Sequence, residues 1–138
     1  MKPLYLDAAS TTPVFPAVVK AMMPFFSQTY GNPSSPHTLG EQALKALNDA
    51  RTRLARELHA KPQEIIFTSG ATESNNLALF GLAHHSKKKK IIVSSIEHAS
   101  MRAPCDYLRS WGYTIVTLPV NSEGFVDCAR LEKEIDDA

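Results

Sequence analysis

The sequence predicts an α/β fold with an incomplete, mostly parallel sheet, crossover helices and an N-terminal arm. Two observations lead to this prediction. From residue 64 onward, short apolar runs of strand length alternate with segments of helical length. This alternation is typical of right-handed crossovers between parallel strands. The last helical segment has no further strand to lead into, so we expect an open sheet edge that a partner chain or additional chain covers.

The first forty residues differ in composition from the remainder. They hold six of the nine prolines, together with Gly31 and Gly40. Proline and glycine at this density favour turns and extended arms, with one short helix near Phe15 to Phe26. We therefore assign residues 1–40 to an N-terminal arm with loops, and residues 41–138 to the first part of an α/β domain that is cut short.

A long amphipathic helix is predicted from Glu41. Its apolar residues recur at helical spacing, with charged or polar residues between them: Ala43, Leu47, Ala50, Leu54 and Leu58.

Three strand and helix pairs follow this long helix. The first strand is expected at 64–67 with a helix at 73–84, and the second at 91–95 with a helix at 99–110. A third strand at 113–120 precedes a helix that carries Leu131 and Ile135, for which Asp127 is the expected N-cap. The predicted sheet therefore has three parallel strands.

Composition narrows the class of protein. The chain has 138 residues, of which 43% are hydrophobic and 21% charged, and a formal charge of +1, so no nucleic acid or anionic membrane is expected as a partner. The apolar run 17–26 is too short to cross a bilayer. Two cysteines provide neither a disulfide framework nor a zinc site, which favours a reducing, cytoplasmic setting. His84, His85 and Lys87 to Lys90 are expected in a solvated surface turn without a metal, and without the aromatic residues of a nucleic-acid surface.

A small polar loop, residues 68–72, joins the first predicted strand to its helix. The N–H groups at a helix start attract anions. Gly70 and Ala71 would allow close approach, and the hydroxyls of Ser69 and Thr72 could donate further hydrogen bonds. One glycine without a following lysine matches neither the dinucleotide fingerprint nor the P-loop, so a phosphorylated cofactor fits better. Alternatively, Thr68 or Ser69 simply caps the helix.

His98 follows the second predicted strand, at the carboxyl edge where open parallel sheets bind ligands. This places it at the same edge as the 68–72 loop. Its imidazole could stack on a heteroaromatic ring whose phosphate the loop holds. The alternative is a surface or capping histidine.

Four motifs in order resemble the cysteine desulfurases of the class V aminotransferase superfamily, in the nitrogen-fixation and iron–sulfur-cluster subgroup. The resemblance extends over almost the whole chain, and the ten-residue third motif is its most specific part. The motifs are Tyr5-Leu6-Asp7 with Thr11-Thr12-Pro13; Gly31-Asn32-Pro33-Ser34-Ser35 with His37 and Gly40; Phe67-Thr68-Ser69-Gly70-Ala71-Thr72-Glu73-Ser74-Asn75-Asn76; and Glu97-His98.

The resemblance implies a type I fold of pyridoxal 5′-phosphate (PLP) dependent transferases and a homodimer. It further implies that Ala71 and Thr72 hold the cofactor phosphate and that His98 stacks on its ring. The implied reaction converts L-cysteine to L-alanine and transfers sulfur to an enzyme persulfide for iron–sulfur cluster or thio-cofactor synthesis. A sulfur acceptor or iron–sulfur scaffold protein is then expected as a partner.

No catalytic residue is expected within these 138 residues. In the family, the Schiff-base lysine and the nucleophilic cysteine lie beyond the region that matches, so the chain alone is expected to be inactive. Cys105 and Cys128 are expected to be buried structural thiols, and Asn32 and His37 to have structural roles. The alternatives are another class V enzyme, such as a selenocysteine lyase or an aminotransferase, and a non-catalytic binding module.

Overall fold

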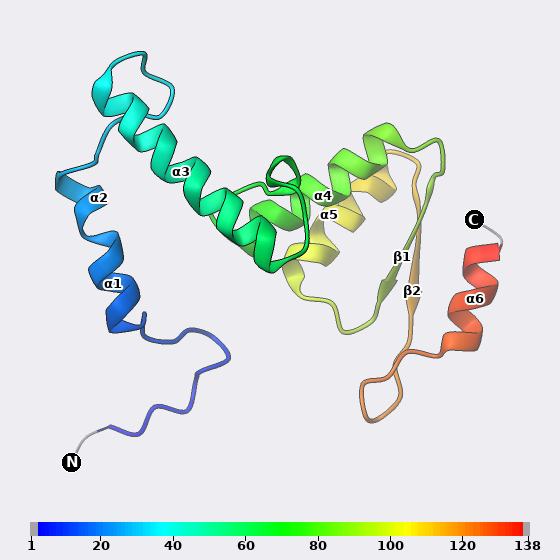
Figure 1. The fold of residues 1–138 in the computed structure, drawn as a ribbon. Coiled ribbons are helices and arrows are strands. Elements are labelled where there is room, and N and C mark those ends of the chain that lie inside the picture. The colour runs from blue at the N-terminus through cyan, green and yellow to red at the C-terminus, as the bar shows by residue number, and fades with distance from the viewer. Residues whose placement is uncertain (1–2, 137–138) are drawn as a thin grey trace. The chain divides into compact units, whose positions relative to one another are not determined.

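A computed structural model describes residues 3–136 of the chain (Figure 1). The chain divides into two compact units, Met1–Ile66 and Phe67–Ala138. The division at residue 40 that composition indicates remains a prediction.

The first unit opens with two short helices, α1 (Pro16–Met22) and α2 (Pro24–Ser27). The sequence predicted one helix over this range, and that prediction was wrong in one respect. Pro24 has no N–H to donate and its ring clashes with the preceding turn, so a helix ends before it. The last bond of α1 is accordingly donated by the Met23 amide to the Val19 carbonyl.

The predicted amphipathic helix is confirmed as α3 (Thr38–Glu57), which begins three residues earlier than expected. His37 is its N-cap, with ring Nδ1 accepting a hydrogen bond from the Gly40 amide. One side of α3, with Ala46, Asp49, Ala50 and Arg53, lines an open groove of about 640 Å³ together with Val18, Met22 and Phe25 of α1 and α2. Much apolar surface in this unit therefore remains accessible.

The strand predicted at 64–67 does not form. Glu64 closes a short 3₁₀ helix, η1 (Pro62–Glu64), and residues 65–67 belong to no strand. The Ile65 backbone is extended, with φ −96° and ψ 120°. Extended backbone becomes a strand only when a neighbour completes its hydrogen-bond ladder, and none does so within the described residues 3–136.

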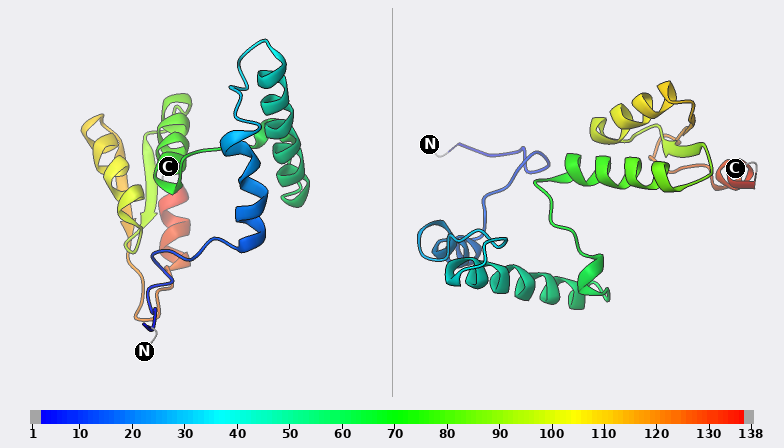
Figure 2. Two further views of the ribbon diagram at one scale, coloured as in Figure 1. Left: turned by 90° about the vertical axis from the view of Figure 1, so that its left-hand side faces the viewer. Right: turned by 90° about the horizontal axis from the view of Figure 1, so that it is seen from above.

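The second unit is a layered α/β structure. Strands β1 (Lys90–Ser94) and β2 (Thr114–Leu118) pair in parallel, with Lys90 opposite Thr114 and Ser94 opposite Leu118. Helix α5 (Ala99–Ser110) connects them, as predicted for a crossover. In the part of the chain that the structure describes, the sheet has two strands rather than the predicted three. Helices α4 (Ala71–His85) and α5 lie on one side of the strands and α6 (Cys128–Asp136) on the other (Figures 1 and 2).

The core of this unit lies between α4, α5 and the strands. Ala83, Leu108 and Tyr113 are buried at its centre. The Tyr113 hydroxyl donates a 2.6 Å hydrogen bond to the Ala83 carbonyl, which satisfies the polar atom of the buried side chain. This bond joins the start of β2 to α4.

Helix α6 is capped at its start and contacts β1 near its other end. Asp127 Oδ1 accepts from the Arg130 amide, which confirms the predicted N-cap. Near the other end, the ammonium of Lys90 lies 3.0 Å from the Glu134 carboxylate and donates to the Glu134 carbonyl at 2.7 Å. The expectation that Lys90 belongs to a solvated turn was therefore wrong, since it begins β1 and its side chain is only 15% exposed.

Candidate functional site

The start of α4 leaves backbone donors available, as the sequence predicted. Gly70 is the N-cap and contributes no side-chain cap, and the first helical bond comes from the Ser74 amide to the Gly70 carbonyl. The amides of Ala71, Thr72 and Glu73 therefore precede the first intrahelical bond. A Cβ added at Gly70 would meet nothing within 4 Å, so the backbone there is open to an approaching group. The simple cap by Thr68 or Ser69 does not form.

The Ser69 hydroxyl is not available to an anion, contrary to what the sequence suggested. Its amide and its hydroxyl both donate to Glu73 Oε2, each at 2.7 Å. These two bonds, the hydroxyl bond first, hold the pKa of the Glu73 carboxyl below its ordinary value. Glu73 thus accepts both hydrogen bonds that Ser69 can donate. In the first turn of α4, the hydroxyl of Thr72 makes no hydrogen bond to the described residues.

His98 is the N-cap of α5. Its ring Nδ1 accepts from the Ser100 amide at 3.1 Å and lies 2.9 Å from the Ser100 hydroxyl. An atom that accepts an amide hydrogen bond carries no proton, so this geometry corresponds to the tautomer of the neutral ring with its proton on Nε2. The capping role, which was the alternative for this residue, is confirmed. It leaves the exposed ring faces available.

Asn75 connects the two helix starts, a role that the sequence did not reveal. Its Nδ2 donates to the Ser100 hydroxyl at 2.9 Å, and Ser100 in turn contacts His98. The N-terminal ends of α4 and α5 therefore lie at the same end of the helix pair. The sequence placed the 68–72 loop and His98 at the same sheet edge, whereas the structure brings together the helix starts that carry Thr72 and His98 through the hydrogen bond from Asn75 to Ser100. Asn75 and Ser100 are 25 residues apart, and no local pattern links them.

The two cysteines have different surroundings. Cys105 is 2% exposed, as predicted, and burial raises the pKa of its thiol, with the Asp106 charge contributing further. The prediction of burial was wrong for Cys128, which is exposed at the start of α6.

The motif at 31–40 has a structural role, as expected. Asn32 Oδ1 accepts from the Ser34 amide and His37 caps α3. Gly40 is buried, and a Cβ there would lie 2.1 Å from the Ser35 carbonyl oxygen. Glycine is therefore required for this close backbone approach.

Two further findings concern residues 3–136. No group of three or more His, Cys, Asp or Glu side chains in this range is arranged to hold a metal ion. No helix described there has the length and apolar character needed to cross a membrane.

The fold and the site define an α/β protein of the open parallel type, with helix-start amides and an imidazole at one end of a helix pair. A sequence model of the aminotransferase class V family matches residues 4–138, and the chain belongs to this family.

Its curated relatives include cysteine desulfurases. The chain is 46% identical over 134 residues to cysteine desulfurase IscS of Dictyoglomus turgidum, covering 96% of this chain and 34% of the relative. It is 42% identical to the human cysteine desulfurase, covering 98% of this chain and 30% of the relative. The chain thus spans about a third of the length of the curated relatives it matches.

Solved structures agree. A NifS-like protein matches with a TM-score of 0.85 and 38% identity, covering 90% of this chain and 34% of that protein. A structure described as SspA in complex with cysteine matches with a TM-score of 0.86 and 40% identity, covering 94% of this chain and 38% of that one. These likenesses confirm the predicted fold class.

Proposed function

We propose that these residues form the phosphate and ring-stacking side of the PLP site of a cysteine desulfurase, an enzyme that converts L-cysteine to L-alanine and retains the sulfur as a persulfide. One observation carries the proposal: the hydrogen-bonded chain from Asn75 through Ser100 to His98 brings the start of α4 and an exposed imidazole to the same end of one helix pair. The cysteine desulfurase names of the relatives support the reaction.

The residues present fit such a cofactor. A phosphate dianion is attracted by the positive end of a helix and by its free amides. The amides of Ala71 and Thr72 lie at this position, the Thr72 hydroxyl is without a bond to the described residues, and Gly70 leaves the approach open. The one acidic residue of the motif at 67–76, Glu73, accepts two hydrogen bonds from Ser69.

Each residue has a definite task in this proposal. Ala71 and Thr72 anchor the phosphate, while the cap bond from the Ser100 amide fixes the His98 ring so that one face can lie against the cofactor ring. Pyridoxal phosphate, when bound, supplies the electron sink for the reaction. The lysine and cysteine that the chemistry requires are not assigned within these residues. We also propose a homodimer in a reducing, cytoplasmic setting, with an iron–sulfur scaffold or another sulfur acceptor as partner.

The binding role is tested with pyridoxine 5′-phosphate, which lacks the aldehyde and so reports non-covalent contacts alone. The protein is used at the length at which it naturally occurs, called the native-length protein below. We expect the substitution Thr72→Val to weaken binding of pyridoxine 5′-phosphate about 10-fold or more, because a hydrogen bond to a charged group contributes roughly 1.5–3 kcal/mol. His98→Ala should also weaken it. Equilibrium dialysis measures both, with Ser110→Ala, at the far end of α5, as the matched control. Equal affinity in all variants would contradict the assignment.

The reaction is tested separately. The native-length protein should release alanine from L-cysteine, and residues 1–138 expressed alone should not, because no lysine is assigned to the cofactor there. Alanine analysis of both samples decides the point. Alanine formed by residues 1–138 alone, or none formed by the native-length protein, would contradict the proposal.

A further inference from the structure

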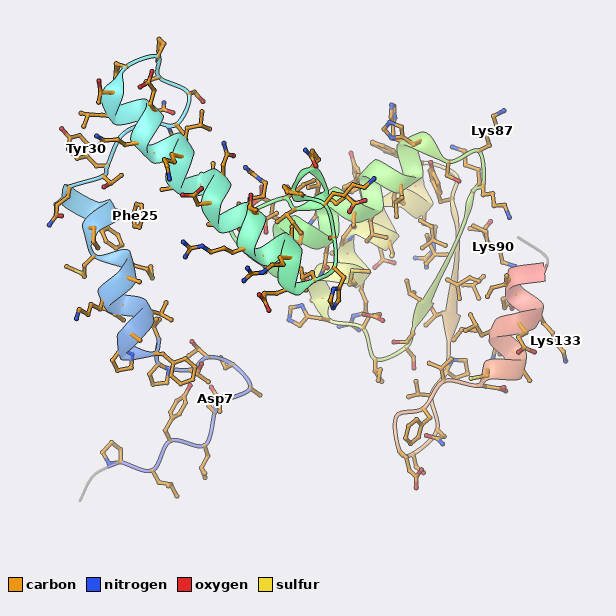
Figure 3. All side chains as sticks on the ribbon, viewed as in Figure 1. Asp7, Phe25, Tyr30, Lys87, Lys90 and Lys133 are labelled. Carbon is orange, nitrogen blue, oxygen red and sulfur yellow. The ribbon has the colours of Figure 1, made fainter. Side chains whose placement is uncertain are left out.

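A basic and aromatic surface lies at the opposite end of the helix pair from the proposed cofactor site. We define the Lys–Trp surface as His84, Lys87, Lys89, Tyr107 and Trp111. Lys87 projects from the loop between α4 and β1 (Figure 3). The aromatic residues come from the last turns of α5, and Trp111 is its C-cap. The two groups are separate in the sequence, and the packing of α4 against α5 brings them together.

The surface surrounds a small pocket of about 230 Å³. The buried residues Tyr113, Leu108 and Ala83 form part of its lining, and the rest comes from Phe80, His84, Ser86, Lys89 and Trp111. The Lys89 ammonium lies 4.2 Å from the centre of the Tyr113 ring, a cation–π contact that holds the charge at the pocket. The pocket therefore has a buried apolar side and a cationic side.

The aromatic residues remain accessible although they contact one another. Tyr107 and Trp111 are 53% and 59% exposed, and their ring centres are 5.0 Å apart. Phe80 supports both rings from α4, at 5.9 Å and 6.3 Å. Trp111 contacts Phe80, yet more than half of its surface is open. Exposed, pre-arranged Trp and Tyr side chains are typical binding anchors.

Charge and size identify the occupant. None of the residues that line the pocket, all of them in the described part of the chain, is acidic, so an anionic group would find complementary charge. At about 230 Å³ the pocket is smaller than the usual range for a free small-molecule site, roughly 300–1,000 Å³, and suits one side chain of a larger partner.

A protein partner fits better than a nucleic acid. The whole sequence has a formal charge of +1 and a pI near 7.8, well below the strongly basic character of nucleic-acid-binding domains. The rings of Tyr107 and Trp111 are tilted 54° to each other, which does not provide a series of parallel platforms for bases.

We propose that the Lys–Trp surface binds an acidic segment of a partner protein. A carboxylate of the segment enters the pocket beside Lys89 and His84, a second carboxylate meets Lys87, and an apolar side chain of the segment packs on Trp111. This binding is independent of the desulfurase reaction, because the surface shares no residue with Ala71, Thr72 or His98.

The test measures binding of the native-length protein to a fluorescein-labelled peptide of about ten glutamates with one central leucine, by fluorescence anisotropy at low salt. We expect the double variant Lys87→Gln, Lys89→Gln to weaken binding about 10-fold or more, and Trp111→Ala several-fold, because both halves of the surface contribute. Lys133→Gln, which removes an exposed lysine on α6 outside the pocket, should bind as the unchanged protein does. Added salt should weaken binding.

Two comparison probes complete the design. A peptide with glutamine in place of glutamate should not bind, and an oligothymidylate of similar length should bind more weakly than the acidic peptide. Equal binding of the glutamine peptide, tighter binding of the oligothymidylate, or equal losses in the Lys133→Gln variant would each overturn the proposal. Thermal melting midpoints that match across the variants show that a loss of binding is not a loss of folding.

Discussion

At the scale of single residues, the two cysteines differ in burial. Cys105 lies inside the α5 packing, while Cys128 begins α6 in solvent. The thiolate is the reactive form of cysteine, and burial opposes the charge that it carries. The raised pKa of Cys105 therefore predicts an unreactive thiol, whereas accessibility alone favours reaction at Cys128.

We expect iodoacetamide to label Cys128 at neutral pH and Cys105 far more slowly. Because the pKa of Cys105 lies above the ordinary value of 9.0, its labelling should rise only at a more alkaline pH than that of an ordinary thiol. Peptide mass mapping of the native-length protein after timed labelling measures both sites. Comparable labelling of the two cysteines at neutral pH would show that Cys105 is not protected by burial.

At the scale of elements, α3 and α5 end in the same motif with different residues. In α5 the Gly112 backbone has φ 84°, and the Tyr113 amide donates to the Leu108 carbonyl. In α3 the corresponding position is His59, with φ 51°, and the Ala60 amide donates to the Ala55 carbonyl. This left-handed conformation suits glycine and is strained for a residue with a side chain.

Replacing His59 by glycine should therefore stabilise the protein by about 1 kcal/mol, because the strain at this position is removed. The reverse change at the matched position, Gly112→Ala, should destabilise it by a similar amount. Urea denaturation followed by circular dichroism compares both variants with the unchanged chain. A lower midpoint for His59→Gly would mean that its side chain makes a compensating contact.

The contact of α6 with β1 depends on Lys90 and Glu134, whose side chains are 15% and 27% exposed. We expect Lys90→Met to destabilise the protein by roughly 1–2 kcal/mol, since it leaves a poorly solvated carboxylate without its partner. Amide hydrogen exchange should then quicken in α6.

The control for this variant is Lys45→Met, which breaks the exposed pair with Asp49, where the side chains are 78% and 53% exposed. Such exposed pairs contribute about 0.3–0.5 kcal/mol. Equal effects of the two substitutions would show that the Lys90 pair gains nothing from its partial burial.

At the scale of the whole molecule, apolar surface is abundant. The structure exposes 11,214 Å² for a mass of 15.2 kDa. Two separate compact domains of half this mass would expose about 8,600 Å² in total, by the usual scaling of surface with mass. Large apolar side chains contribute to the excess in both units, among them Leu6, Phe26, Leu82 and Phe125. Such surface is normally covered by further chain or by a partner.

Residues 1–138 expressed alone should therefore self-associate. Sedimentation velocity over about a 100-fold concentration range should show growth in average mass, because apolar surface drives association. A monomer at every concentration would mean that the exposed side chains do not form a continuous adhesive patch.

The sequence by itself determined the features that depend on local period and on short motifs. The spacing from Ala43 to Leu58 predicted α3, the alternation of apolar runs predicted the parallel pairing of β1 with β2, and Asp127 marked the start of α6. Each of these follows from residues close together in the chain. The motif around Gly70 and the histidine at 98 identified the family for the same reason.

The tertiary structure decided what depends on distant partners. It left residues 65–67 without a strand neighbour and joined Asn75 to Ser100 across 25 residues. It also paired Lys90 with Glu134 across 44 residues and left Cys128 exposed. Hydrogen bonds, ladders and burial require a partner in space. No local pattern specifies which of many distant residues supplies that partner, so these features emerge only when the chain packs.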